Sequence, residues 1–309
     1  AEVGRTSSAE PPSKYVWIGL QQCAVKHDNF PYPIENIRGT IEGENDRWRF
    51  HNLQGTNDSG FVACDGKFQS TGLGNELLLH FDCEKIPLEF ELRDALNPGV
   101  QQLWTDLKPH GTVDIDCDLR YDTHNKKLSV TAKVDPIPGT TSIEPTYFPY
   151  RMENLQGTMV YRDGDVELQN ITAEHGAVKM QTGGSCEVNP DGSWALTLEG
   201  LSVDRLQLNH DLHRALPIRL RSAVDRLGWQ GQLSIRDSLL QLSGSGTLGE
   251  SAKSRWRIYL DTHAGSMNSG VPLHNIHGGV TLEGAFDGEH LRSWGTINVD
   301  SVSYEDFQL

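Results

Sequence analysis

The sequence is short of the apolar residues that build thick, closed cores. Hydrophobic residues make up 37% of its 309 residues, below the roughly 45–50% of ordinary globular domains, a share that also counts glycine. Glycine is abundant, with 31 residues. A curved sheet with one apolar face and one wet face needs fewer apolar side chains than a closed core, so this composition favours such a sheet.

Positive charge is also scarce. Lys and Arg number 27 against 42 Asp and Glu, which gives a net charge of −15. Nucleic acid and anionic lipid both attract basic patches. We therefore expect no nucleic-acid partner and no flat docking on anionic lipid.

Membrane and targeting segments are missing too. No apolar run approaches the roughly 20 residues that span a bilayer, and no charged-then-apolar signal peptide opens the sequence. Residues 1–13 are interpreted as a polar linker or a cut end. The final SVSYEDFQL is interpreted as part of a strand that is interrupted by the end of the sequence. We expect a fragment whose membrane contact is made through segments that lie elsewhere.

Catalytic motifs are absent from the sequence. It has no GxSxG elbow and no phosphate-binding glycine loop, and its glycine-rich segments Thr71–Glu76 and Ser243–Glu250 are predicted to be hairpin turns. The five cysteines are too widely spaced for a CxxC pair. The sequence leaves undecided whether Cys64 and Cys83 form a disulfide. We expect no catalytic residue, no cofactor and no enzyme activity.

Two patterns could hold a metal, and each has a plainer interpretation. Asp114, Asp116 and Asp118 share one strand face, where clustered carboxylates could bind calcium. The positions 120 residues later carry no carboxylate, which favours a solvated face. His274 and His277 form an HxxH pattern, but residues three apart in a strand point to opposite faces. We expect no metal site.

An internal repeat is the strongest signal in the sequence. The phrase PIENIRGTIEG (Pro33–Gly43) matches RMENLQGTMVY (Arg151–Tyr161) and PLHNIHGGVTL (Pro272–Leu282). The shared asparagines are 118 and 121 residues apart. We divide the chain into the end of a preceding repeat (14–30), a first unit (31–148), a second unit (149–271) and the start of a third (272–309).

A helical element is predicted in each unit. Leu92–Ile115 aligns with Leu212–Ile235 at an offset of 120 and keeps the i, i+3, i+4, i+7 apolar pattern of an amphipathic helix. The matching residues are Val100, Leu103, Trp104 and Leu107, and then Leu220, Ala223, Val224 and Leu227. Pro98 suits the start of this helix. A shorter helix, with Asp94 or Asn209 near its start, would precede it.

The rest of each unit alternates apolar and polar residues, which predicts strands. The clearest stretches are residues 47–50, 112–121, 127–134, 165–168, 193–201, 255–260 and 295–302, and turns such as RDGD (162–165), NPDG (189–192) and FDGE (286–289) join them as hairpins. About six to eight strands per unit are expected. The predicted fold class is mainly β: an elongated, repeated antiparallel sheet with a helix–kink–helix element in each repeat of about 120 residues.

Four phrases resemble the AsmA/TamB-like superfamily of envelope proteins, which shares the bridge-like lipid-transfer architecture. They are Pro31–Gly55, Ala95–Ile115, Pro149–Gly176 and Glu283–Gln308, and AsmA-like proteins of planctomycete-type bacteria are especially similar in them. The resemblance implies a β-taco, a sheet folded lengthwise into a groove that is apolar inside and wet outside. It also implies an inner-membrane anchor, a periplasmic body and movement of phospholipid between membranes.

We therefore predict a lipid-binding or lipid-conducting segment whose partners are phospholipid or another acyl-chain ligand, together with envelope proteins. The alternative is a non-enzymatic structural or interaction scaffold, a β-solenoid or adhesin-like protein that binds protein or glycan. Tryptophans such as Trp48, Trp194 and Trp256 fit either a ligand path or ordinary sheet packing. The predicted groove lining is Ile37, Ile41, Trp48, Phe50, Val113, Ile115, Leu155, Met159, Val166, Leu168, Leu233, Ile235, Ile276 and Val280. A one-residue slip in register would invert this assignment.

Overall fold

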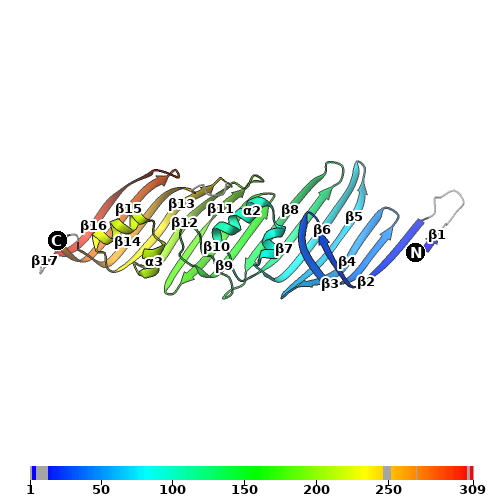
Figure 1. Cartoon of the computed structure of the whole chain (residues 1–309), viewed down its shortest axis with the longest axis horizontal. Helices are drawn as coiled ribbons and strands as arrows, with labels where there is room; N and C mark the ends of the chain where they lie inside the picture. Colours follow the sequence, from blue (N-terminus) through cyan, green and yellow to red (C-terminus); the bar gives the residue numbers. More distant parts are fainter. Residues whose placement is uncertain (1, 5–12, 246–251, 269, 305–306, 309) are drawn as a thin grey trace. The chain divides into compact units, whose positions relative to one another are not determined.

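The computed structural model of the chain describes residues 2–4, 13–245, 252–268, 270–304 and 307–308. Most of the predicted linker at residues 1–13, and the turn predicted in Ser243–Glu250 beyond residue 245, lie outside the described residues. Strands take up 70% of the chain and helices 11%, so the prediction of a mainly β protein is confirmed. The strands form one antiparallel sheet that does not close on itself (Figure 1). None of the described helices is long and apolar enough to cross a bilayer.

The sheet is a meander in which each strand pairs with the next one in sequence. The strands are β1 (Glu2–Gly4), β2 (Ser13–His27), β3 (Phe30–Glu44), β4 (Arg47–Asn57), β5 (Gly60–Thr71), β6 (Gly74–Pro87), β7 (Thr112–Asp122), β8 (Lys127–Pro136), β9 (Glu153–Arg162), β10 (Asp165–His175), β11 (Val178–Val188), β12 (Trp194–Gln207), β13 (Gln232–Gly244), β14 (Lys253–Asn268), β15 (Pro272–Phe286), β16 (Leu291–Tyr304) and β17 (Phe307–Gln308). The turns predicted at residues 162–165, 189–192 and 286–289 join β9 to β10, β11 to β12 and β15 to β16. Short turns return the chain at once, so sequence neighbours become sheet neighbours.

Two pairs of short helices interrupt the meander: α1 (Phe90–Ala95) with α2 (Pro98–Leu107), and α3 (His210–Ala215) with α4 (Ile218–Leu227). Pro98 occupies the first turn of α2 as expected. The expectation that Asp94 lies near the start of a helix is wrong, because α1 begins at Phe90 and Asp94 is near its end. The Asp94 carboxylate does not cap a helix but pairs with Arg93 at 2.6 Å. Asn209, in contrast, caps α3 by accepting a hydrogen bond from the Leu212 backbone N–H.

The repeated Asn-x-x-Gly phrase has the same backbone conformation in all three copies. Asn36, Asn154 and Asn275 have φ of 56°, 51° and 48°, a left-handed conformation that asparagine tolerates better than most residues. The glycines three residues later also have positive φ: Gly39, Gly157 and Gly278. In β3 the pairing register with β4 shifts across this asparagine. The phrase therefore encodes a β-bulge, a device that bends a strand and increases its twist.

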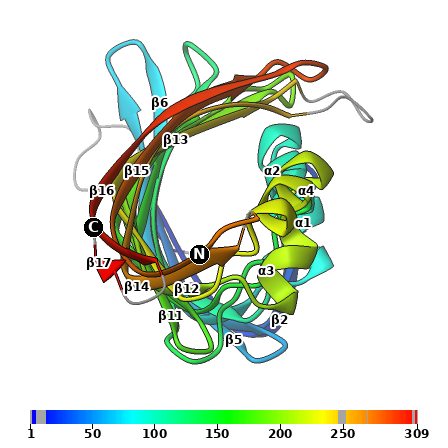
Figure 2. The same ribbon diagram turned by 90° about the vertical axis from the view of Figure 1, so that its left-hand side faces the viewer.

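The described chain divides into two compact units. Unit 1 comprises residues 1–96, 111–137 and 159–164, and unit 2 comprises residues 97–110, 138–158 and 165–309. Helix α2 belongs to unit 2, although it precedes β7 in sequence, because it packs on β11 and β12. In Figure 2, α3 and α4 of unit 2 lie on the concave side of the curved sheet that β11–β16 form.

Candidate functional site: an apolar sheet face with an open hollow

Unit 1 has one apolar and one polar sheet face, as its cross-strand register shows. Residues directly opposite each other in an antiparallel pair point to the same side. One such row runs from Ile41 through Phe50, Gly66 and Leu79 to Leu119. Flanking rows on this face are Trp48, Phe68, Leu77 and Tyr121, and Cys64, Phe81, Cys117 and Ala132. Apolar side chains thus form continuous bands across the strands of unit 1.

An open hollow of about 630 Å³ is centred on this row. Phe50, Leu79 and Leu119 contribute its central side chains. Gly66 between them contributes none, and the Leu79 side chain lies over it, since a Cβ on Gly66 would be 2.6 Å from Leu79 Cδ2. The remaining lining residues are their strand neighbours Arg49, His51, Asp65, Lys67, Leu78, His80, Asp118 and Arg120. The exposed surface of the hollow is mostly apolar. Its volume is within the roughly 300–1,000 Å³ of small-molecule sites.

Tryptophans on the apolar faces lie over glycines of the neighbouring strand. Three pairs show this: Trp48–Gly43 in unit 1, and Trp194–Gly244 and Trp256–Gly284 in unit 2. A Cβ atom on Gly43 would lie 2.7 Å from the Trp48 ring, and one on Gly244 would lie 2.6 Å from the Trp194 ring. These rings pack against backbone, so at least this part of their role is ordinary sheet packing.

Unit 2 also has rows of apolar side chains on one sheet face, and more of that face is buried by packed side chains and a helix. A row on its apolar face runs through Val203, Ile235, Leu260 and Val280 to Ile297. A buried cluster occupies one part of this face: Val178, Leu201 and Val203, with Met180, Leu206, Ile235 and Leu240 packed against it. Helix α2 covers another part, because Gly99 lies against the Val188 side chain.

No family model, curated protein or solved structure matches the chain. The likeness to the AsmA/TamB-like superfamily therefore rests on the four sequence phrases given above.

The residues predicted to line a groove are buried or half-buried, and none is fully open to solvent. Val113, Leu155 and Ile276 are the buried ones, with 1%, 7% and 7% exposed. The half-buried ones are Ile37, Ile41, Trp48, Phe50, Ile115, Met159, Val166, Leu168, Leu233, Ile235 and Val280. The register brings Ile41 opposite Phe50, and Ile115 and Met159 opposite the same residue, Val134. Of the predicted set, only Phe50 lines the hollow.

The predicted set lacks Leu78, Leu79 and Leu119, the three leucines that line the hollow. Leu119 could have been found, since it continues the alternation of Val113 and Ile115 in β7. Leu79 could not, because it sits in an unbroken apolar run, residues 77–79, whose facing no alternation reveals.

Buried thiols form part of the apolar face of unit 1. Cys64 and Cys117 both lie opposite Phe81, one on each side of it. Burial raises the pKa of Cys64 and of Cys83 to about 12 and that of Cys117 to about 11, so all three are neutral thiols. All five cysteines are free, and the Cys64–Cys83 disulfide left open by the sequence is not formed. These thiols act as small apolar side chains.

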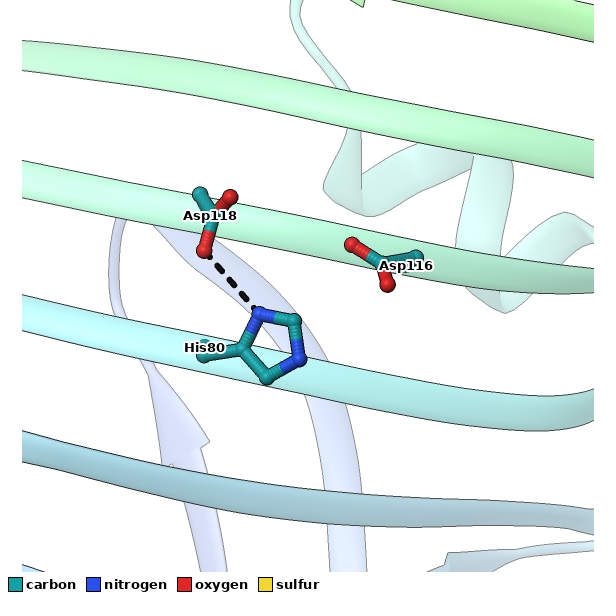
Figure 3. A group of neighbouring side chains, drawn as sticks. All are labelled: His80, Asp116 and Asp118. Atoms are coloured by element: carbon teal, nitrogen blue, oxygen red, sulfur yellow. Dashed lines mark hydrogen bonds and ion pairs between the residues drawn. The ribbon is translucent and has the colours of Figure 1, made fainter.

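On the polar face of unit 1, His80 of β6 meets Asp116 and Asp118 of β7 (Figure 3). His80 Nδ1 and Asp118 Oδ1 are 3.0 Å apart, and this hydrogen bond raises the pKa of His80. All three side chains are exposed. Asp114, the remaining aspartate of the sequence pattern, is engaged elsewhere: its Oδ1 accepts a 2.8 Å hydrogen bond from the Lys85 backbone N–H at a bulge. The three aspartates therefore do not act as one group.

Proposed function

We propose that the chain is a lipid-binding or lipid-conducting segment of a periplasmic, bridge-like protein of the AsmA type, which holds acyl chains against its apolar sheet face. The observation that carries this proposal is the open hollow of about 630 Å³ over Phe50, Leu79 and Leu119. It lies on continuous apolar bands, and large exposed apolar surfaces of soluble domains usually serve binding.

The energetics of acyl-chain binding suit such a surface. Burial of a methylene group is worth about 0.8 kcal/mol, so full burial of a sixteen-carbon chain would contribute on the order of 10 kcal/mol. An open face buries only part of a chain, and the affinity is correspondingly lower. Because successive rows present similar side chains, a bound chain that slides along them exchanges one set of contacts for an equivalent one. Headgroups stay in water, so the site needs no polar pocket.

Two features support curling of the sheet into a groove. Strand bulges recur beyond the repeated phrase, with left-handed residues such as Asn52, Lys85, Asn170 and Asp237, and regular bulges are a means of curving a sheet. Helix pairs start at Phe90 and at His210, 120 residues apart, which supports one helical element for each repeat.

The test is lipid content after gentle purification, followed by binding of a fluorescent fatty acid. The chain should copurify with phospholipid detected by mass spectrometry. Replacement of Leu79 by Gln should lower fatty-acid binding several-fold, because a polar group would enter the hollow. The control is Leu73→Gln, which changes an 80% exposed leucine in the turn between β5 and β6 that does not line the hollow.

The outcome that would overturn the proposal is a folded chain that purifies without lipid and binds no fatty acid. Equal loss of fatty-acid binding in both leucine variants, with thermal melts unchanged, would also count against it. Binding would then not depend on the apolar side chains of the hollow. A lipid-free chain would favour the scaffold alternative, in which the apolar rows serve only to hold the strands together.

A further inference from the structure

We propose that a second, smaller pocket in unit 2, which we call the amide pocket, binds a neutral saccharide. It has a volume of about 340 Å³ and is lined by Gln207, Leu208, Asn209, Trp229, Gln230, Gly231 and Gln232. The chain leaves the sheet for α3 through the first three of these residues and returns from α4 to β13 through the last four. The proposal concerns a different surface from the hollow of unit 1 and does not rest on acyl-chain binding there.

The lining of the amide pocket is polar but carries no charge. Four of its seven described residues have amide side chains, and none of the seven is acidic or basic. A phosphate or carboxylate ligand would lack a cationic partner here, and a metal ion would lack a carboxylate ligand. The ligand class that fits is therefore neutral and rich in hydrogen-bonding groups.

The glutamine amides of the pocket are available to a ligand. Gln207 of β12 and Gln232 of β13 lie directly opposite each other, so their side chains project to the same side of the sheet. Neither amide group, nor that of Gln230, forms a hydrogen bond among the residues that the structure describes. The backbone, in contrast, is fixed: the Gln230 N–H donates to the Ser266 carbonyl at 2.8 Å, and the Thr262 hydroxyl donates to the Gln232 carbonyl at 3.2 Å.

Trp229 gives the pocket an apolar wall and one more donor. Its ring packs on β14, since a Cβ on Gly265 would lie 2.4 Å from it. The indole Nε1 is buried and has no acceptor among the described residues, and an unpaired buried donor costs free energy that a ligand oxygen would recover. A sugar suits this combination, because its C–H groups are apolar and its hydroxyls, like amide side chains, can engage both donors and acceptors.

A peptide is the other neutral ligand with many hydrogen-bonding groups, and it fits this place less well. Extended peptides commonly bind by adding a strand to a sheet edge. β13 is not an edge, because β12 and β14 pair with it on its two sides. β15 and β16 follow β14 in the sheet, so the pocket borders interior strands.

The equivalent place in unit 1 lacks the amides. The bridge between Gln230 and Ser266 has its counterpart between His110 and Ser142, so the backbones are paired alike. The side chains differ: 120 residues before Gln207, Asn209, Trp229, Gln230 and Gln232 stand Pro87, Glu89, Pro109, His110 and Thr112. The amide pocket is thus a property of the side chains of unit 2.

The test is an NMR titration of the full chain with three neutral disaccharides: N,N′-diacetylchitobiose, maltose and lactose. We expect saccharide binding to shift the indole N–H signal of Trp229 and the side-chain amide signals of Gln207 and Gln232. The proposal is overturned if none of the three shifts these signals at millimolar concentration. It is also overturned if a neutral capped peptide, N-acetyl-triglycine amide, shifts them and the saccharides do not.

Variants show whether the amides make the contacts. Gln207→Leu/Gln232→Leu should bind the saccharide roughly 25-fold more weakly, at about fivefold for each lost hydrogen bond of ordinary strength. Trp229→Phe, which keeps a ring but removes the donor, should weaken binding about fivefold. The matched control is Gln54→Leu/Gln181→Leu, which changes two exposed glutamines of β4 and β11 that do not line the pocket. Thermal melts check that all variants fold, and an equal loss of binding in the control would refute the assigned site.

Discussion

Asp106 of α2 accepts a hydrogen bond of 3.0 Å from the indole Nε1 of Trp194 in β12, 88 residues away in sequence. Both side chains are buried, with 7% and 4% exposed. Gln102, one turn earlier in α2, also donates to Asp106 Oδ2 at 3.2 Å. This bond holds α2 on the apolar face of unit 2, and it satisfies a carboxylate that would be costly to bury without donors.

Loss of the indole donor should therefore destabilise the chain. Trp194→Phe is expected to lower the free energy of unfolding by about 1.5–3 kcal/mol, the range for hydrogen bonds to charged groups. Urea unfolding measures it. Trp256→Phe is the control, because Trp256 also lies over a glycine, Gly284, but is only half-buried. Similar losses in both variants would mean that ring packing, and not the bond to Asp106, holds α2.

The glycine of the repeated phrase should not tolerate a side chain. In Gly157→Ala, a residue with φ of 115° would acquire a Cβ only 2.7 Å from the Asn170 carbonyl oxygen. We expect a loss of about 1–3 kcal/mol from backbone strain and crowding, visible as a lower Tm. Gly72→Ala should be close to neutral, because a Cβ there meets nothing within 4 Å. A neutral Gly157→Ala would show that the bulge can relax.

The pKa of His80 should be higher than that of a free histidine side chain. Its hydrogen bond to Asp118 raises its pKa, so the stabilisation is fully present below the unfolded pKa of roughly 6.5 and is lost as pH rises through the folded pKa. The two side chains are 52% and 70% exposed, which limits the contribution to below about 1 kcal/mol. NMR titration should give a higher pKa in the native chain than in Asp118→Asn. The same pKa in both would contradict the ion pair.

The buried thiols should be slow to react in the folded state. Burial raises the pKa of Cys64 and Cys83 to about 12 and that of Cys117 and Cys186 to about 11. Since the thiolate is the nucleophile, iodoacetamide at pH 8 should leave these four thiols largely unmodified until the chain is unfolded in urea. Peptide mass spectrometry locates the label. Fast native labelling of Cys83 would mean that the sheet opens easily around β6.

Local features of the chain could be read from the sequence because they depend on residues close together. Alternation over residues 112–121 predicts β7, and turn residues at 162–165 predict the hairpin between β9 and β10, because side-chain periodicity and turn conformation are short-range properties. The Asn-x-x-Gly phrase likewise marks its own bulge. The residues that begin the short helices were predicted only in part. Asn209 caps α3 as expected. Asp94, in contrast, pairs with Arg93 near the end of α1, which begins at Phe90.

Which residues meet was decided only by the tertiary structure. Bulges interrupt the alternation, so that β4 pairs with β5 through Phe50 and then Leu53, three residues on, and no local pattern reveals this change of face. Leu79 lies in the apolar row of Phe50 and Leu119 while Leu78 points to the other side of the sheet, because pairing with β5 and β7 fixes the register of β6. The bond between Asp106 and Trp194 depends in the same way on where α2 packs. The sequence by itself thus determined the strands, turns and repeat, and long-range pairing determined the faces, the hollow and the position of α2.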